Sequence, residues 1–561
     1  MSPEVWLVLA AVLAVGWLAP QVGDGWFQPV EEAAARFATR KTLAIFSMGL
    51  AAILTRLALL PVLPVPIPAI HDEFSYLLAA DTFAHGRLTN PPHPMSVFFD
   101  TFHVLQHPTY ASKYPPAPGA VLALGQILGH PWIGSLLSMA GMCMAMTWML
   151  QGWFPAPWAL LGGVFVLLQL GLFRHWVDGY FGGAVAALGG ALVLGAFPRV
   201  VHFRRLRDAI LMGMGAALLA SSRPVEGLIF CVPIAGALAL EFLSKRKWSR
   251  AGTVRRVLLP LILVPAAALV FLGYYNWRVT ENAFLFPYVL YQREYFSDPV
   301  FAWQKPNPPL HYANQQFEVF FNVWHPTRYG RSWNEWERRS WQTCQAWWYV
   351  FLGPLLSVPF VALPWMLKGR RVRFLLVQFL VCAAGLLSVV WFQPHYAAPL
   401  AATLFGLLVQ AMRYLRRLEF RGRAVGIFLT RLVVILVLDG VVVLAGHARR
   451  YPVVGWNRDR AQLIERLDAS PGRHLVLVHY SPEHNVHHEW VYNAADIDRA
   501  KIVWAREIPG RDWTTLLDYF KDRKIWMVGA DDSPPKLEEY RRPEQLLPGR
   551  ASRAGGSLNG Q

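Results

Sequence analysis

Apolar residues occur in long runs along most of the chain, separated by short polar or charged segments. A helix of about 20 apolar residues spans the roughly 30 Å hydrocarbon core of a bilayer. The runs therefore predict a polytopic α-helical membrane protein with about twelve membrane-spanning helices. We place them at residues 5–19, 42–60, 131–150, 157–174, 184–200, 208–222, 225–243, 257–276, 347–367, 374–393, 396–412 and 425–445.

Lysine and arginine gather in four of the short segments between these runs, at residues 203–208, 245–256, 368–373 and 413–423. All four fall on one side of the membrane when the runs are counted in order. Short loops rich in positive charge stay in the cytoplasm, so this side is predicted to be cytoplasmic. Residues 61–130, residues 277–346 and everything after about residue 446 are then expected to be extracytoplasmic.

Composition agrees with a membrane protein, because 54% of the 561 residues are hydrophobic and only 16% are charged. The formal net charge is +17. The basic residues lie mainly in the four short loops and the C-terminal region, without an aromatic-basic recognition motif. Anionic lipid headgroups therefore explain this charge better than a nucleic acid partner does, and no nucleic acid is expected.

Neither cysteine nor histidine spacing indicates a metal or disulfide framework. The four cysteines are widely separated, and three of them lie within predicted helices. The stretch "HNVHHEW" at 484–490 lacks the spacing of a zinc site and is interpreted as a solvated loop. No cofactor is assigned, and a requirement for a divalent metal stays open.

The pattern changes character after residue 446. Buried strands are predicted at 474–480, 501–506 and 524–531, with helices at 459–468 and 513–523. This alternation predicts a small extracytoplasmic α/β domain, residues 446–542, with a three-stranded parallel sheet. Residues 543–561 are poor in apolar side chains and are expected to be a disordered tail. Residues 1–40 are predicted to form an N-terminal membrane helix and an interfacial segment, and 41–445 a transmembrane domain.

The first extracytoplasmic loop opens with a proline-rich stretch, "PVLPVPIPAI" at 61–70, which cannot continue a helix. From Asp72 to His85 the residues favour a short surface helix with Asp72 and Glu73 in its first turn. Acidic residues at this position commonly serve only to meet the positive end of the helix dipole. The surrounding loop favours chemistry instead, because it carries Arg87 and ends in "YASKYPPAPG" at 110–119. A cation such as Lys113 at the bilayer surface suits a phosphate, and a nearby carboxylate suits removal of a proton.

This order of elements resembles the GT-C superfamily of membrane glycosyltransferases. The shared features are an acidic residue at the start of the first extracytoplasmic loop, a Lys-Pro-like element at its end, many membrane helices and a distal soluble domain. The resemblance covers roughly residues 40–415. It is strongest to the branch that contains protein O-mannosyltransferases and the bacterial aminoarabinose transferase of lipid A.

The resemblance implies roles for individual residues. Asp72 becomes the catalytic base, with Glu73 as the competing candidate, and Asp178 in "FRHWVDGYFGG" becomes the second acid. Lys113 becomes the contact to the donor phosphate. Because Tyr114 separates Lys113 from the following proline, Arg87 is the alternative contact.

Two further segments supply weaker candidates. In "SSRPVEG" (221–227), Arg223 and Glu226 suit either a structural ion pair or a phosphate contact. In "WFQPHYAAPL" (391–400), Tyr396 suits an interfacial anchor or a substrate contact. The candidate substrate-binding residues are Tyr76, Tyr114, His395 and Tyr396.

The expected function is transfer of a sugar from a polyprenyl-phosphate donor to an extracytoplasmic lipid, glycan or protein acceptor, with inversion as the resemblance implies. The expected location is the bacterial inner (cell) membrane. The sequence carries no Rossmann fingerprint or DxD triplet to hold a sugar nucleotide. The alternatives are a transporter or lipid flippase, which would more often place its charged residues mid-helix, and a scaffold that displays the C-terminal domain.

Overall fold

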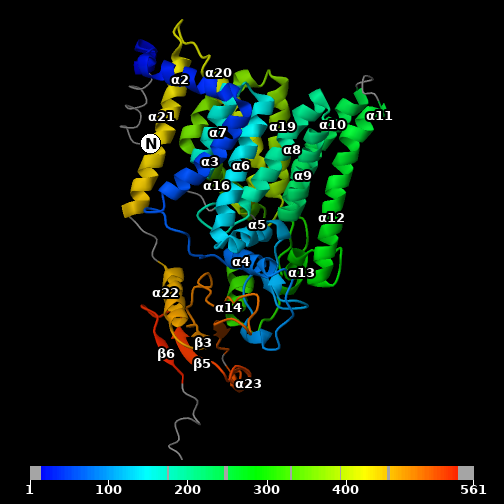
Figure 1. The fold of residues 1–561 in the computed structure, drawn as a ribbon, viewed down its shortest axis with the longest axis vertical. Helices are drawn as coiled ribbons and strands as arrows, with labels where there is room; N and C mark the ends of the chain where they lie inside the picture. The colour runs from blue at the N-terminus through cyan, green and yellow to red at the C-terminus, as the bar shows by residue number, and fades with distance from the viewer. Residues whose placement is uncertain are drawn as a thin grey trace, which may run out of the picture. The chain divides into compact units, whose positions relative to one another are not determined.

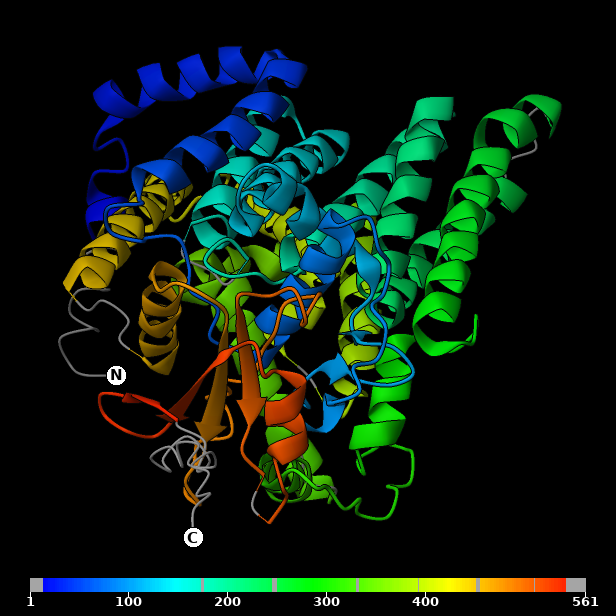
Figure 2. The ribbon, with the colours of Figure 1, turned by 60° about the horizontal axis from the view of Figure 1, so that its bottom comes forward.

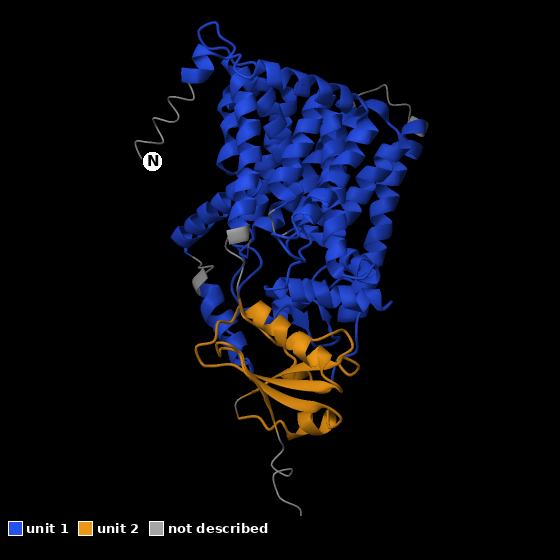
Figure 3. Ribbon diagram, turned by 60° about the vertical axis from the view of Figure 1, so that its left-hand side comes forward, with its two compact units in different colours: residues 1–93, 102–454 blue, residues 94–101, 455–561 orange. Residues whose placement is uncertain are grey.

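The computed structural model describes residues 14–172, 176–244, 250–328, 332–391, 393–450, 455–508 and 510–540. Part of the first predicted membrane helix and the predicted disordered tail, 543–561, lie outside these ranges. The chain divides into two compact units (Figure 3). Unit 1 comprises residues 1–93 and 102–454, and unit 2 comprises residues 94–101 and 455–561.

Unit 1 is a bundle of helices (Figure 1). Their bounds are α2 Asp24–Thr39, α3 Lys41–Ala58, α4 His71–Ala84, α5 Pro116–Ile127, α6 Pro131–Trp153, α7 Ala156–Leu170, α8 Gly183–Phe203, α9 Leu206–Ser222, α10 Pro224–Ser244, α11 Arg250–Thr253, α12 Leu259–Thr280, α13 Pro287–Tyr295, α14 Gln315–Phe317, α15 His325–Arg328, α16 Trp333–Phe351, α17 Gly353–Ser357, α18 Leu363–Met366, α19 Arg370–Leu387, α20 Ala401–Leu415 and α21 Val425–Arg450.

Seven helices among the described residues are long and apolar enough to cross a membrane, which makes the chain an integral membrane protein. They are Lys41–Ala58, Pro131–Trp153, Gly183–Phe203, Pro224–Leu243, Val254–Thr280, Pro394–Leu415 and Val425–Ala448. The pair Trp333–Phe351 and Gly353–Met366, bent by 94°, gives an eighth span if it is counted as one. The seven match predicted runs. The predicted run 347–367 instead covers only the end of Trp333–Phe351, crosses the bend and continues through Gly353–Met366. The runs 157–174 and 208–222 form the shorter helices α7 and α9, and the run 374–393 lies mainly in α19, which begins with three arginines among its first four residues.

Small residues on α8 allow close helix packing, as their spacing of four predicts. The helix packs against both α6 and α9 (Figure 1). At Gly190, an added Cβ would lie 2.6 Å from the carbonyl oxygen of Pro399 and 2.9 Å from its Cα. Only glycine therefore fits where α8 meets the 3-10 segment Pro394–Leu400.

The first loop of unit 1 has the predicted connector and the predicted short helix. Residues 61–70 are not helical, and α4 follows at His71. A two-stranded antiparallel sheet, β1 Val104–Leu105 and β2 Ala111–Ser112, comes next and leads into α5. Figure 1 shows α4, α5 and α13 at one end of the bundle, and α2 and α11 at the other.

Unit 2 contains a four-stranded sheet in the order β4-β3-β5-β6 (Figure 2). Its strands are β3 His474–His479, β4 Ile502–Arg506, β5 Lys524–Gly529 and β6 Leu537–Glu539, with helices α22 Trp456–Ala469 and α23 Thr514–Tyr519. β3 pairs in parallel with β4 and β5, which confirms the three predicted parallel strands. The antiparallel edge strand β6 adds a fourth strand that the sequence pattern did not indicate.

Unit 2 also takes eight residues from the first loop of the chain, Pro94–Thr101. Phe99 is buried and meets Phe520 at 6.2 Å between ring centroids. Asp100 interacts electrostatically with the buried Arg506 of β4. The small domain is therefore completed by a segment that precedes its own strands by more than 350 positions.

The close approach at Gly190 predicts that replacing this glycine destabilises the protein more than replacing a glycine with open space around it. Gly190→Ala should lower the free energy of unfolding by about 1–3 kcal/mol, because the new methyl group meets backbone that cannot rotate away. Gly236→Ala on α10 is the matched control, since an added Cβ there meets nothing within 4 Å. Thermal unfolding of the purified protein in detergent measures both. Equal midpoints for the two variants would contradict the packing described here.

Candidate active site

Asp72 stands in the first turn of α4, with its carboxylate between a tyrosine and a histidine. The Tyr114 hydroxyl donates a hydrogen bond to Asp72 Oδ1. His103 Nε2 lies 3.9 Å from Asp72 Oδ2. The Asp72 side chain is 17% exposed, whereas that of His103 is 3% exposed. Asp72 therefore combines fixed partners with access from outside.

Glu73, the neighbouring acid, has both carboxylate oxygens occupied by backbone. Oε2 accepts from the N–H groups of Ala69 and Ile70 at 2.9 and 3.1 Å, and Oε1 accepts from that of Tyr180 at 3.1 Å. Burial raises the Glu73 pKa to about 7, although the three backbone donors oppose that rise. These bonds indicate a structural role for Glu73, so the geometry favours Asp72 in the choice that the sequence left open.

Lys113 is buried in a cage of aromatic rings. Its Nζ lies 2.8 Å from His103 Nδ1, which joins Lys113 to Asp72 through one imidazole. The same nitrogen lies between 4.7 and 5.9 Å from the centroids of five rings, those of Tyr114, Tyr288, Tyr291, Phe296 and Trp391. Burial lowers the Lys113 pKa to about 7, against the opposing effect of Asp72. The ammonium group is thus poised to gain or lose its proton near neutral pH.

His103 is held in this position by several segments. Its φ of 66° lies in the left-handed region, which is rare for a residue with a side chain. Its backbone N–H donates to the Tyr291 hydroxyl at 2.8 Å, and its carbonyl accepts from the Ser75 hydroxyl at 2.6 Å. A backbone conformation that the surroundings enforce in this way is typical of functional sites.

Arg223 brings a second buried cation to the same cluster. Its guanidinium lies 4.2 Å from the centroid of the Tyr396 ring, and its Nη2 is buried without a hydrogen-bond partner among the described residues. Tyr76 and Tyr114, whose rings stack at 4.3 Å, both interact electrostatically with Arg223. The hydroxyl of Tyr76 likewise has no hydrogen-bond partner among the described residues, and burial raises its pKa to about 12.

Asp178 pairs with an arginine that the sequence interpretation missed. Arg56 Nε donates to Asp178 Oδ1 at 2.9 Å, and Arg56 also donates to the carbonyl oxygens of Leu63 and Pro64. Burial raises the Asp178 pKa to about 6, although Arg56 opposes that rise. Two residues further on, Tyr180 donates its N–H to Glu73. The segment that carries Asp178 is therefore bound to the start of α4.

Arg87 and His395 lie at the edge of the contacts described above. Arg87 lines a cavity of about 630 Å³ together with apolar side chains of α5, α9 and α12. Ser221, two residues before Arg223, lines the same cavity. The His395 ring packs against that of Phe181 and against that of Tyr396, at 5.2 and 4.9 Å between centroids. Among the described residues, no three His, Cys, Asp or Glu side chains are grouped so that they could hold a metal ion.

Of the residues that the sequence interpretation missed, Arg56 could have been recognised from its surroundings in the chain, whereas the aromatic partners of Lys113 could not. Arg56 is a charged residue inside an apolar run, which by itself marks a functional or structural site in a membrane protein. The partners of Lys113 gave no such signal, because Tyr288, Tyr291, Phe296 and Trp391 are ordinary members of aromatic-rich segments. Only the fold brings them to Lys113.

Comparison with solved structures gives distant matches. ArnT from Cupriavidus metallidurans bound to undecaprenyl phosphate matches over 86% of this chain and 92% of its own, with 12% identity and a TM-score of 0.48. The Archaeoglobus fulgidus oligosaccharyltransferase complex with Zn and sulfate matches over 87% of this chain and 67% of its own, with 11% identity and a TM-score of 0.43. No protein-family model and no curated protein matches the chain. Such low identities and TM-scores assign no role to any residue here.

The Arg56–Asp178 ion pair predicts that loss of the Asp178 carboxylate destabilises the protein. Asp178→Ala should lower the free energy of unfolding by about 3 kcal/mol, because it leaves the buried Arg56 guanidinium without its counter-charge. Asp81→Ala on α4 is the matched control. Asp81 is 23% exposed against 24% for Asp178. It accepts a hydrogen bond from the neutral Gln126, and it leaves no cation buried when it is removed, because its other neighbour, His85 at 3.3 Å, is 62% exposed. We expect a loss of only about 1 kcal/mol there. Thermal unfolding compares the two variants, and equal losses would show that the ion pair adds nothing.

Proposed function

We propose that this chain is an integral membrane glycosyltransferase that uses a polyprenyl-phosphate-linked sugar. One observation carries the proposal: a partly exposed carboxylate, Asp72, shares a buried cluster with two cations, Lys113 and Arg223. A base beside an anion-binding region is what displacement of a phosphate by a hydroxyl group requires. The resemblance of the loop motifs to GT-C enzymes supports the same reaction.

In the proposed reaction, Asp72 removes the proton from the acceptor hydroxyl. The acceptor oxygen then forms a bond to the anomeric carbon of the sugar, while the bond from that carbon to the phosphate oxygen breaks. Negative charge develops on the departing polyprenyl phosphate. Lys113 and Arg223 stabilise that charge, and they act strongly because they are already in place and shielded from water. The single-step displacement inverts the anomeric centre.

The cavity beside Arg87 is the proposed site for the lipid part of the donor. Its volume is about 630 Å³, and its walls include Met214, Leu218 and Phe271, which belong to helices of the bundle. Apolar walls at membrane depth suit an isoprenoid chain. Pro116 and Ala117, which shortly follow Lys113, line the same cavity, and so does Ser221, two residues before Arg223. Arg87 then assists at the phosphate end.

The proposed active site faces the extracytoplasmic side. Basic residues at the opposite end of the bundle, including Arg205, Arg207, Arg370 and Arg371, are on the side that the distribution of positive charge assigns to the cytoplasm. A lipid-linked donor is suited to that location, because sugar nucleotides are made in the cytoplasm. The acceptor is proposed to be a lipid, glycan or protein outside the cytoplasm.

The role of Asp72 can be separated from donor binding. Asp72→Asn keeps the shape of the side chain but cannot accept the proton, so turnover should fall at least about a hundredfold. Binding of the donor should change by less than about threefold. Asp81→Asn, on the same helix, is the control and should keep its turnover. Turnover is measured with a polyprenyl-phosphate sugar, and near-normal turnover of Asp72→Asn would refute the assignment.

The lowered pKa of Lys113 predicts that the affinity for the donor depends on pH. The phosphodiester of the donor keeps its charge between pH 6 and 9, whereas the Lys113 pKa is about 7 in the free protein. A bound phosphate raises that pKa, so affinity should be full below pH 7 and should fall by up to about tenfold per pH unit above it. Lys113→Arg stays charged and should flatten the profile. His103 and Asp72 are present in both proteins, so parallel profiles would show that Lys113 is not the responsible group.

A further inference from the structure

A second cavity lies at the end of the bundle remote from the candidate active site. Its volume is about 1300 Å³, which exceeds the roughly 300–1,000 Å³ typical of small-molecule pockets. It is lined by residues at the ends of several helices, where α3 begins at Lys41, α6 ends at Trp153, α8 ends at Phe203 and α19 begins at Arg370. The cavity is therefore at the level where spans leave the bilayer.

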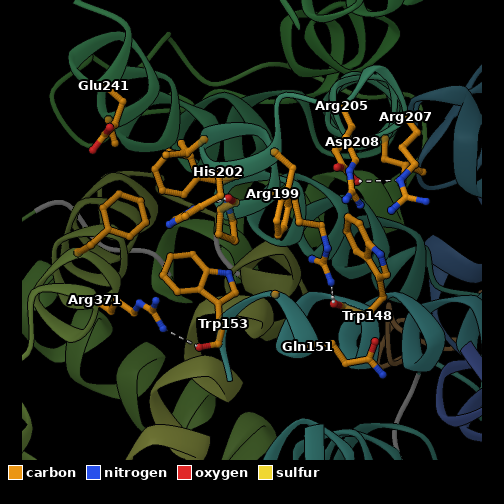
Figure 4. A pocket seen from close by; sticks show the side chains of 18 of the residues that line it. Trp148, Gln151, Trp153, Arg199, His202, Arg205, Arg207, Asp208, Glu241 and Arg371 are labelled. Atoms are coloured by element: carbon orange, nitrogen blue, oxygen red, sulfur yellow. Dashed lines mark hydrogen bonds and ion pairs between the residues drawn. The ribbon is translucent and has the colours of Figure 1, made fainter. Parts of the chain in front are cut away.

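The lining of this cavity is strongly basic (Figure 4). Six lysine and arginine side chains line it against two carboxylates, those of Asp208 and Glu241. The six are Lys41, Arg199, Arg205, Arg207, Arg370 and Arg371. Asp208 lies 3.7 Å from Arg207 and compensates only part of this charge. The surplus of positive charge selects an anionic ligand.

Two of these arginines are held in fixed positions. Arg199 donates to the carbonyl oxygens of Gly195 and Trp148 at 2.6 and 2.7 Å, and its guanidinium lies 4.0 Å from the centroid of the Trp148 ring. Arg371 donates to the carbonyl oxygen of Trp153 at 3.2 Å. Figure 4 shows both arginines directed to these tryptophan residues. Guanidinium groups fixed in advance lose little side-chain entropy when they bind an oxyanion.

The remainder of the wall is apolar. The rings of Trp153, Phe197 and Phe374 stack on one another, with interplanar angles between 11° and 25°. Leu240 near the end of α10 also lines the cavity and is 69% exposed. A free phosphate would gain nothing from these surfaces. A ligand with an anionic head and an apolar continuation would contact both parts of the wall.

We propose that this cavity binds the phosphate headgroup of an anionic phospholipid on the side of the membrane opposite the catalytic cluster. The fixed Arg199 and Arg371 and the exposed Lys41, Arg205 and Arg370 together contact the phosphate. The aromatic wall contacts the beginning of the acyl chains. The proposal is independent of the transferase reaction, because none of the lining residues belongs to the candidate active site.

Direct binding of lipid to the purified full-length protein tests the proposal. Native mass spectrometry in detergent measures the apparent Kd of phosphatidylglycerol and of phosphatidylcholine. The test variant combines Lys41→Gln, Arg205→Gln and Arg370→Gln, three exposed positions in the lining. The matched control combines Arg255→Gln, Arg256→Gln and Arg373→Gln. It removes the same charge on the same side of the membrane, but its positions do not line the cavity.

We expect phosphatidylglycerol to bind at least about tenfold more tightly than phosphatidylcholine. The test variant should weaken phosphatidylglycerol binding by about a hundredfold, or about fivefold for each single substitution, and the control by less than about threefold. The single variants Lys41→Gln and Arg205→Gln preserve the comparison if the triple variant does not fold. Equal loss in both triple variants, or equal binding of the two lipids, would overturn the proposal.

Soluble phosphate is the other source of the same chemistry. Glycerol phosphate and inorganic phosphate are therefore added as competitors at up to millimolar concentration. If phosphatidylglycerol stays bound, the lipid is the ligand, as proposed. If glycerol phosphate or inorganic phosphate displaces phosphatidylglycerol completely from the control variant but not from the test variant, the cavity is a site for soluble phosphate. That result would overturn the lipid proposal.

Discussion

The carboxylate of Glu73 holds together the part of unit 1 on which the candidate active site depends. It accepts hydrogen bonds from backbone amides of two segments, Ala69 and Ile70 before α4 and Tyr180 more than a hundred positions later. Hydrogen bonds to a buried carboxylate are strong because the surroundings have a low dielectric constant. Both the start of α4 and the segment of Asp178 are thereby fixed, and the carboxylate of Asp72 takes its position from the first of them.

Burial also determines how the cations of the site can act. Lys113 is surrounded by aromatic faces, and its Nζ lies 2.8 Å from His103 Nδ1. Burial makes the charged form of Lys113 only marginally stable. The same burial would strengthen the attraction between its ammonium group and a bound phosphate, because the surroundings have a low dielectric constant. Arg223 cannot lose its proton and stays charged throughout. Arg223 therefore carries a permanent positive charge, whereas the charge of Lys113 depends on whether an anion is bound beside it.

Much of the fold followed from the sequence, because long apolar runs indicate membrane helices, and short apolar runs between turns indicate buried strands. The edge strand β6 was not predicted, because its three residues, Leu537–Glu539, are largely polar and exposed. Adjacent residues on a helix point about 100° apart, so Asp72 and Glu73 could not be distinguished before α4 was seen in its surroundings. The position of His103 depends on a positive φ, and the pairing of Arg56 with Asp178 joins residues 122 positions apart. Neither has a local signature in the chain.

The inclusion of Pro94–Thr101 in unit 2 sets an order for biosynthesis. These residues leave the ribosome long before β3, β4 and β5 are synthesised. Phe99 cannot make its contact with Phe520 until Phe520 has been added to the chain. Closing a loop of that length is entropically costly, although the cost grows only slowly with the number of residues. Unit 2 is thus completed last. A truncated polypeptide would retain the membrane helices but leave the apolar side chains of this segment exposed, a state that quality-control proteases can recognise.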